Sequence, residues 1–476
     1  MTGPAAPRRR TASRALVPVL LSTGVVVAAI SSLGAPLVPA IAAANGVSLP
    51  DAQWALTVTL LVGAVATPVL GRLGDGPRRR AVVLTVLGVV VAGSVLAALP
   101  LGLGWLITGR GLQGLGLGLT PVAIAIARDA LPGPRARATQ AALSIMVAAG
   151  VGVGYPLAGL VAGAGGVHAA FWAGAAVSGA ALAAAALVLP PSPAVPARRL
   201  DVVGALLLGT GLAAGVLALS EAEVLGWTSP RLALLAGVCV AALAAWVAWA
   251  LRTPSPVVDL RLARGRTAGT AHSAALLVGL ANYLLLSSVP LLAQTPTSTG
   301  YGAGASIGVA GLVLLPFSVA SVLAGRLARL LADRAGIRAV VPVGAVVIAA
   351  AHALYALTGG GLWQLCVVMT VAGLGVGAAF AALPALVVSA VPAGETGSAM
   401  SLNQVLRYVG FAVGSATTAT VLEAATPPGA GYPVAGGYAV IGLIGCAIGL
   451  LTAAVTWVLP ARAPTAPTTE PASSGR

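Results

Sequence analysis

Long uncharged stretches dominate this chain, and almost every charged residue lies in a short gap between two of them. Of the 476 residues, 58% are hydrophobic and only 8% are charged, far from the composition of a soluble globular protein. Ala15–Ala44, Ala81–Leu99 and Val202–Leu219 contain no charge and reach the roughly 18 residues that a bilayer-crossing helix needs. The pattern predicts an all-α, polytopic membrane protein with about fourteen transmembrane helices.

Arginine is distributed unevenly between the two sets of gaps. All 26 basic residues are arginine. When the N-terminus is placed inside, the outer gaps receive only Arg231, and two arginines, Arg110 and Arg407, fall within predicted helices. This one-sided distribution is the positive-inside pattern. It predicts a multi-pass protein of the cell (cytoplasmic) membrane with both termini in the cytoplasm.

The composition also excludes several kinds of chemistry. Without lysine, the chain has neither a Gly-Lys-Ser/Thr phosphate loop nor an amine for pyridoxal or retinal. Its 3 cysteines and 3 histidines do not have the spacing of metal ligands. The net charge of +15 is spread over loops without neighbouring aromatic residues, which argues against nucleic acid. We therefore expect no cofactor, no metal, no nucleic-acid partner and no enzymatic activity.

No gap is long enough to fold on its own, so we expect the function to lie between helices. Six predicted helices precede the linker Pro190–Asp201, two follow it, and six more come after Thr267. This 6 + 2 + 6 arrangement is typical of transporters built from two repeated halves. The predicted parts are a cytoplasmic tail, a six-helix bundle, linkers with two extra helices, a second six-helix bundle and a second cytoplasmic tail: residues 1–14, 15–189, 190–267, 268–459 and 460–476.

The gap after the second predicted helix carries an acid among arginines, which an ordinary positive-inside loop does not need. Its sequence is Gly71-Arg-Leu-Gly-Asp-Gly-Pro-Arg-Arg-Arg80. A turn-forming glycine, an acid and a basic cluster at this place resemble the loop signature of the major facilitator superfamily, shortened by one residue before the basic cluster. The resemblance implies the major-facilitator fold and a conformational latch on the inner side, formed by Gly71, Asp75, Arg78, Arg79 and Arg80.

Two further segments resemble motifs of the same superfamily. Leu106–Gly116 is similar to its Arg-x-x-Gln-Gly motif and contains Arg110 and Gln113. An arginine within the bilayer usually faces a polar interior because its burial in lipid is costly. Gly150–Gly159 resembles the glycine–proline motif of the antiporters. Glycine allows close packing and proline removes a backbone hydrogen bond, so we expect a flexible helix that contains Gly150, Gly154, Pro156 and Gly159.

Later segments resemble one branch, the fourteen-span drug–proton antiporter family, which has two extra central helices. The resemblance covers most of the chain, and the order of the segments is more specific than any single motif. It implies proton-coupled export of drugs, antibiotics or other small organic compounds by alternating access. The segments are Leu200–Gly204, Gly226–Pro230, Pro256–Leu262, Gln294 and Gly397–Gly410.

The residue that commonly titrates in this family is missing. Ile30 stands where the family places an aspartate in its first helix. All 11 acidic residues lie in gaps or at the ends of predicted helices, whereas proton relays in membranes usually rely on buried carboxylates. His272 and His352 are the remaining candidates for proton coupling because unperturbed histidine titrates near neutral pH.

The candidate substrate site combines polar residues from three predicted helices. Asn403, Arg407, Gly410 and Gly414 follow one helical face. Asn282 and Tyr283 lie near the middle of the ninth predicted helix. Together with Arg110 and Gln113, we expect them to line a central cavity with aliphatic walls. Because the fixed charges there are positive, the cavity suits an apolar or anionic compound better than a cationic one.

We therefore expect a monomeric secondary transporter whose partners are the lipid bilayer, a small-molecule substrate and protons. The missing acid leaves open a proton-independent facilitator or importer with the same fold. A non-transporting membrane enzyme or receptor would require clustered catalytic residues near a bilayer face, or a sizeable soluble domain. The sequence offers neither.

Overall fold

The computed structural model describes residues 7–33, 37–192, 200–226, 229–263, 265–430 and 432–458. Within these ranges the chain forms helices and no strand, which confirms the predicted all-α class. Thirteen of the described helices are long and apolar enough to cross a membrane. The expected second tail, 460–476, and part of the central linker, 193–199, lie outside the described residues.

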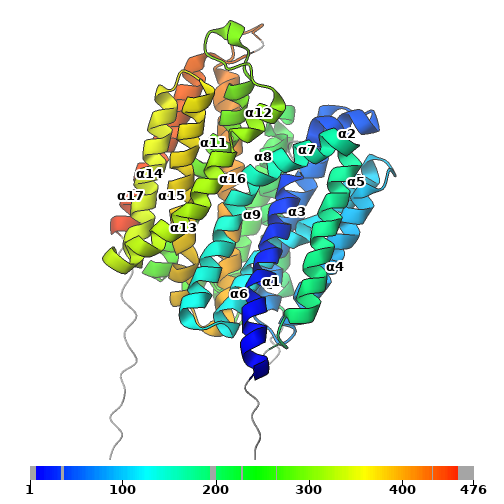
Figure 1. Ribbon diagram of the computed structural model, residues 1–476, viewed down its shortest axis with the longest axis vertical. Coiled ribbons are helices and arrows are strands. Elements are labelled where there is room, and N and C mark those ends of the chain that lie inside the picture. Colours follow the sequence, from blue (N-terminus) through cyan, green and yellow to red (C-terminus); the bar gives the residue numbers. More distant parts are fainter. Residues whose placement is uncertain are drawn as a thin grey trace, which may run out of the picture.

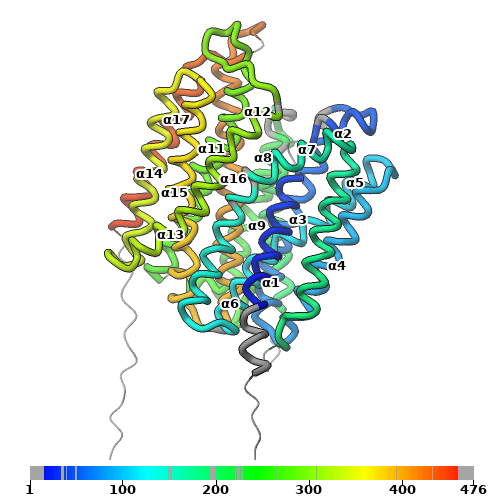
Figure 2. Tube along the Cα trace, in the orientation of Figure 1, coloured from blue at the N-terminus to red at the C-terminus, as the bar shows by residue number. Residues whose placement is uncertain are grey.

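The helices form two lobes, which Figure 1 shows as a group coloured blue to teal beside a group coloured green to red. The trace in Figure 2 shows that α1 begins and α17 ends at the same end of the bundle. The first lobe consists of α1 Pro7–Ser32, α2 Val38–Asn45, α3 Leu49–Gly74, α4 Arg79–Ala98, α5 Leu103–Gly114, α6 Leu119–Ala130 and α7 Gly133–Val188. The second consists of α11 Arg266–Gln294, α12 Ile307–Leu312, α13 Leu315–Ala335, α14 Ile337–Leu357, α15 Leu362–Ser389, α16 Thr396–Ala424 and α17 Ala435–Val458.

Helix α7 crosses the bundle twice. It contains 56 residues, which would span about 84 Å if the helix were straight. Both of its ends nevertheless lie beside the start of α4. Asp129, just before α7, pairs with Arg79 at 2.8 Å, and Ser192, just after it, accepts a hydrogen bond from the Arg80 backbone at 3.0 Å. The reversal occurs at Gly166, whose φ of 76° is non-helical and suits glycine. Since α7 crosses twice, the thirteen helices make fourteen crossings, as predicted.

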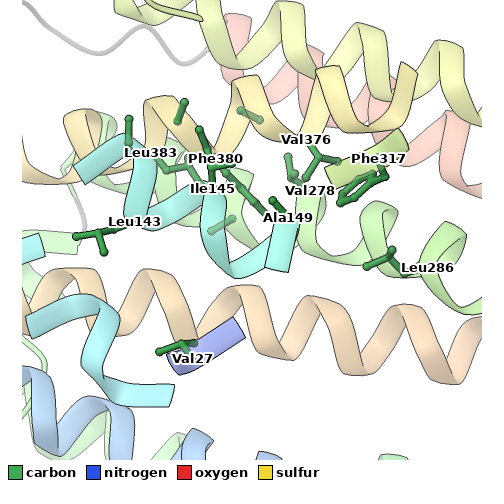
Figure 3. Close-up of a cluster of buried hydrophobic side chains, with 14 of the residues drawn as sticks. Val27, Leu143, Ile145, Ala149, Val278, Leu286, Phe317, Val376, Phe380 and Leu383 are labelled. Atoms are coloured by element: carbon green, nitrogen blue, oxygen red, sulfur yellow. The ribbon is translucent and has the colours of Figure 1, made fainter. Parts of the chain in front are cut away.

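Glycine at helix crossings brings the backbones close together, as membrane helices require. A Cβ added to Gly410 on α16 would lie 2.3 Å from the Leu276 carbonyl oxygen of α11. Across the lobes, apolar side chains fill the contact between α7, α13 and α15. Figure 3 shows Ile145 of α7 in this region with Phe317 and Phe380 of the second lobe.

The two extra helices, α8 Val202–Leu225 and α9 Pro230–Arg252, pack against each other. α8 also contacts α3 of the first lobe and α16 of the second. Asp201 ties the pair to the linker that follows it. One carboxylate oxygen accepts hydrogen bonds from the Gly204 amide at 2.8 Å and the Trp249 indole at 2.9 Å, and the other accepts the Val257 amide at 3.3 Å. The Val257 carbonyl in turn accepts a hydrogen bond from the Ser398 hydroxyl at 2.8 Å, so this linker reaches the first turn of α16.

Candidate functional site

Asp75 joins the two lobes at the arginine-rich end of the bundle. Its two carboxylate oxygens accept hydrogen bonds from the backbone amides of Gly397 at 2.7 Å and Ser398 at 2.8 Å. These amides belong to the first turn of α16, where helix N–H groups lack partners within the helix and the helix dipole favours an anion. Burial is the largest influence on this carboxyl and raises its pKa to about 7.

An ion pair and a second arginine reinforce this junction. Arg72 on α3 lies 2.7 Å from Glu395, and the two side chains are only 6% and 12% exposed. Arg128 at the end of α6 donates hydrogen bonds to the carbonyl oxygens of Val391 and Pro392 at 3.1 and 3.2 Å. All three contacts connect the first lobe to the segment that leads into α16. The arginine-rich end is therefore closed by polar contacts.

Gly71 allows this close approach. A Cβ added at Gly71 would lie 2.6 Å from both the Gly397 carbonyl oxygen and the Ser401 Cβ. Any larger residue would push α3 away from α16 and lengthen the bonds to Asp75. Gly71 and Asp75, on consecutive turns at the end of α3, thus both contribute to the contact with α16.

The three motif arginines have different surroundings. Arg79 is 5% exposed; it pairs with Asp129 and also donates to the Gly74 carbonyl. Arg80 donates to the Ala186 carbonyl at 2.6 Å, and Arg78 is exposed at the start of α4. Of the predicted group, Gly71 and Asp75 contact the opposite lobe directly. Arg79 and Arg80 instead fasten α4 to the two ends of α7.

Arg407 makes a second junction between the lobes, deeper in the bundle. Its guanidinium is 0% exposed and donates to the Ser144 carbonyl at 3.0 Å and to the Ser144 hydroxyl at 3.2 Å. Arg407 and Ser144 each lie eleven residues after the start of α16 and α7, which corresponds to a depth of about 16 Å. The Arg407 Cζ also lies 4.2 Å from the centroid of the Phe380 ring, within the range of a cation–π contact.

Arg110 is bound within the first lobe. It is 0% exposed and donates to the Ala55 carbonyl at 3.0 Å, the Ile30 carbonyl at 3.2 Å and the Gln113 side chain at 2.7 Å. The Gln113 amide then donates to the Ser94 hydroxyl at 2.9 Å. Arg110 therefore reaches position 30, where the family resemblance expects an acid, and finds only a backbone oxygen there.

The predicted substrate residues do not form one cluster. Asn403 donates to the Ala271 carbonyl at 3.0 Å, while Asn282 is 2% exposed and its amide nitrogen has no partner among the described residues. Tyr283 stacks on Phe411 with ring centroids 5.3 Å apart. Gly410 and Gly414 face the α11 backbone, so the predicted face of α16 packs on α11. No hydrogen bond or ion pair between described residues joins Arg110 to Arg407.

Tyr155 lies near both Arg110 of the first lobe and Tyr283 of the second lobe. It lies on α7 within electrostatic reach of Arg110 and of Tyr283 in the other lobe. The two tyrosines are partly exposed. Arg110, Tyr155 and Tyr283 thus lie near one another, and Arg407 lies in a separate position.

The glycines of the predicted antiporter helix pack against α1. A Cβ added at Gly154 would lie 1.8 Å from the Ser32 hydroxyl oxygen, and one at Gly150 would lie 2.1 Å from the Ala28 Cβ. The space around Gly159 is open to 4 Å. Helix α7 continues through Pro156 and breaks only at Gly166.

Both candidate histidines are buried in the second lobe. His272 is 7% exposed and its ring lies 3.5 Å from the Asn403 amide. His352 is 1% exposed, and each of its ring nitrogens faces a backbone carbonyl.

Several residues of the junction escaped the sequence analysis. Arg72 lies inside the motif and Glu395 precedes α16, so their opposite charges near one predicted membrane face were a usable signal for pairing. Ser144 gave no comparable signal because small polar residues are common in membrane helices.

Two lobes of membrane-crossing helices, joined by a polar junction at one end and holding buried arginines inside, define the architecture of a two-lobe membrane transporter. The model of the Major Facilitator Superfamily matches residues 19–201, 194–415 and 271–476. The chain belongs to the Major Facilitator Superfamily, which confirms the resemblance found in the sequence.

Individual proteins show the same likeness. An "Uncharacterized MFS-type transporter" of Mycobacterium tuberculosis is 30% identical, in an alignment that covers 88% of this chain and 62% of that protein. The "Probable actinorhodin transporter" of Streptomyces coelicolor is 30% identical over 80% of this chain and 68% of its own length. The "Multidrug resistance protein Stp" of M. tuberculosis is 27% identical over 78% and 69%. The structure of the human organic anion transporter MFSD10 superposes with a TM-score of 0.62 at 16% identity, covering 93% of this chain and 99% of that one, which shows a shared fold.

Proposed function

We propose that this chain is a secondary transporter that exports small organic compounds by alternating access. The polar junction at the arginine-rich end carries the proposal. Every contact in it, from the Asp75 carboxylate at the start of α16 to the Arg72–Glu395 pair, joins one lobe to the other. Such contacts break when the lobes rock apart, so they act as the latch of a gate. The names of the drug-resistance and actinorhodin-transporter relatives support export.

We place the latch on the cytoplasmic side of the cell membrane. The described loops at that end hold most of the arginines, and the positive-inside rule favours the cytoplasm for them. Both termini then lie in the cytoplasm. We further propose that the working unit is a monomer.

The substrate class that we propose is anionic or uncharged. Arg110 and Arg407 are each 0% exposed, and the hydrogen bonds that they make go to backbone carbonyls, an amide and a hydroxyl. A buried cation without a neighbouring carboxylate repels a second cation strongly. An organic anion or a neutral compound avoids this cost.

Purified protein in proteoliposomes tests the function directly. The probes are carboxyfluorescein, an organic anion, and ethidium, an organic cation, with and without an imposed pH gradient. We expect gradient-driven transport of the anion and weaker transport of the cation. Failure to move either probe, in vesicles that contain folded protein, would count against the transporter itself.

The latch has its own test. Arg72→Glu should open the arginine-rich end by placing two carboxylates together, and the charge-swapped double variant with Glu395→Arg should restore closure. Rescue by the swap separates the ion pair from a general loss of packing. If the double variant does not restore closure, the Arg72–Glu395 pair is not part of the latch.

A proton-independent facilitator is the second candidate. It is favoured by Ile30 at the position expected for an acid and by the location of all described carboxylates in loops or near helix ends. The same assay separates the two, since a facilitator moves the probe down its own gradient and ignores the pH gradient.

A further inference from the structure

His352 has an arrangement of partners that a neutral histidine cannot fully satisfy. Its Nδ1 lies 2.9 Å from the Ile348 carbonyl oxygen on its own helix, α14. Its Nε2 lies 3.0 Å from the Ala281 carbonyl oxygen on α11. A carbonyl can only accept, and a neutral imidazole has one N–H and one lone pair, whereas an imidazolium has two N–H donors. The neutral ring therefore bonds to one carbonyl and turns a lone pair toward the other.

The space for this ring is built into the neighbouring helix. A Cβ added at Gly445 on α17 would lie 1.8 Å from the His352 Cδ2 and 2.3 Å from its Nε2. Only glycine leaves room for the ring between α11, α14 and α17. His352 is 1% exposed, so its polar contacts are made out of reach of bulk water.

The helices α11, α14 and α17 around the ring contain no acidic residue. Two more helices pack on α14: α15 has no acid and only Cys366 as a titratable group, and α13 carries Asp333 with Arg326, Arg329 and Arg334 in its second half. The arginines of α11 and α14, Arg266 and Arg338, lie 15 residues before Ala281 and 14 before His352, or roughly 21 Å away along each helix. The other titratable groups of α11, α14 and α17 are His272 and Tyr283 on α11, Tyr355 on α14, and Tyr438 and Cys446 on α17. A positive charge gained at His352 therefore has no charged side chain of α11, α14 or α17 beside it.

Several hydroxyl-bearing side chains lie between His352 and the opposite end of the bundle. Tyr301, in a loop there, stacks obliquely on Tyr438 with ring centroids 6.1 Å apart. The Tyr438 hydroxyl lies 3.3 Å from the Thr295 hydroxyl. Tyr355, one turn from His352, is 1% exposed, and its hydroxyl has no hydrogen-bond partner among the described residues. His352 is five residues from the end of α14, about 8 Å, and Tyr355 lies between His352 and that end.

We propose that His352 is the residue through which this transporter binds the coupling proton. A proton from the outer solution adds to the ring nitrogen that carries the lone pair and converts imidazole to imidazolium. Both ring N–H groups then donate, and the ring ties α11 to α14. Release requires α11 to shift relative to α14 within the second lobe, which separates the Ala281 carbonyl from the ring, and the same proton then leaves to the inner side.

Protonation of His352 acts on the part of α11 that carries predicted substrate residues. Ala281 immediately precedes Asn282 and Tyr283. Gly279, two residues before Ala281, touches α16 so closely that a Cβ there would lie 2.7 Å from the Arg407 carbonyl oxygen. A change in the α11–α14 bond is thereby passed to the interface that carries Arg407. The inference rests on the proposed transport function but names a coupling residue in place of the absent first-helix acid.

Histidine-selective isotope labelling tests the protonation step without any substrate. The chain has 3 histidines, so ¹⁵N-labelled ring signals can be assigned with His352→Gln, His272→Gln and His168→Gln. We expect the His352 nitrogens to change from neutral to imidazolium-type signals between about pH 8 and 5. A ring that stays in one neutral tautomer over that range overturns the proposal, whatever the transport assay shows.

Transport in proteoliposomes tests the coupling. We expect His352→Gln to lose carboxyfluorescein accumulation driven by a pH gradient while it keeps exchange of the probe down its own gradient. His272→Gln, the matched control in the same lobe, should keep both. Tyr355→Phe, which removes the hydroxyl nearest to His352 along α14 and leaves the ring, should slow gradient-driven transport, so it serves as the second variant if His352→Gln does not yield folded protein.

The outcomes are distinguishable. Undiminished gradient-driven accumulation in folded His352→Gln, or in Tyr355→Phe where His352→Gln does not fold, overturns the coupling role. If wild-type protein moves neither probe, the proposed function fails, and the isotope experiment still decides whether His352 titrates.

Discussion

The contact between Arg407 and Ser144 provides the sharpest test of how the lobes are held together. Arg407→Lys keeps the positive charge but can reach the Ser144 carbonyl or hydroxyl with only one hydrogen bond in place of the two at 3.0 and 3.2 Å. A hydrogen bond from a charged group contributes about 1.5–3 kcal/mol. The stack on Phe380 lies within one lobe, so it is the same whether the lobes are together or apart.

The variant should therefore weaken closure by that one bond, which shifts the ratio of closed to open molecules roughly 10- to 150-fold. Spin labels at Arg135 and Asp333, both exposed at the arginine-rich end on opposite lobes, report the ratio through their distance distribution. Ser144→Ala should have an effect of similar size, and the two changes together should be less than additive. An unchanged distribution in folded Arg407→Lys would refute the reasoning.

Three further predictions concern other parts of the molecule. Ile30→Asp puts a carboxylate beside Arg110, whose Nη1 is 3.2 Å from the residue-30 carbonyl oxygen. Transport of ethidium relative to carboxyfluorescein should then rise by roughly tenfold or more. A constant transport ratio would contradict this prediction. Burial raises the Asp75 pKa from 3.8 to about 7, so the closed state becomes more stable as the pH falls. This stability is complete below pH 3.8 and is lost as the pH rises through about 7. Asp75→Asn should flatten this pH dependence in the spin-label distances. Gly154→Val forces a Cβ to within 1.8 Å of a hydroxyl oxygen on α1 and should cost about 1–3 kcal/mol, seen as a lower thermal midpoint, whereas Gly159→Val, with open space around it, should not.

The sequence was sufficient for the crossings and the lobes. Uncharged runs and one-sided arginines report directly on the bilayer, and each crossing helix satisfies its own backbone. The predicted number of crossings includes both halves of α7, although its helical hydrogen bonding runs almost unbroken through the reversal at Gly166. The sequence also singled out Gly71 and Asp75, which contact the other lobe in the structure, and their role as a latch stays a prediction.

The partners of those residues were harder to predict. Asp75 binds backbone amides of α16, and amides carry no sequence signature. Arg407 could be seen to lie within a helix, but its contact with Ser144 depends on how two lobes far apart in the chain meet. The predicted grouping of Arg110 with Arg407 used residue type and helical face alone. Neither of these gives the depth of a side chain in the bundle or the helix that it faces, and the structure separates the two arginines for that reason.

The pair of extra helices has a consequence for how this family member could be shortened. Ser398 gives its amide to Asp75 and its hydroxyl to the Val257 carbonyl, and Asp201 holds Val257 in place. Ser398 is thus shared between Asp75 of the first lobe and the linker that follows α9. Deleting residues 200–260 would remove Asp201 and Val257, and with them the contact that ties this linker to Ser398. The two extra helices are therefore structurally coupled to the junction between the lobes.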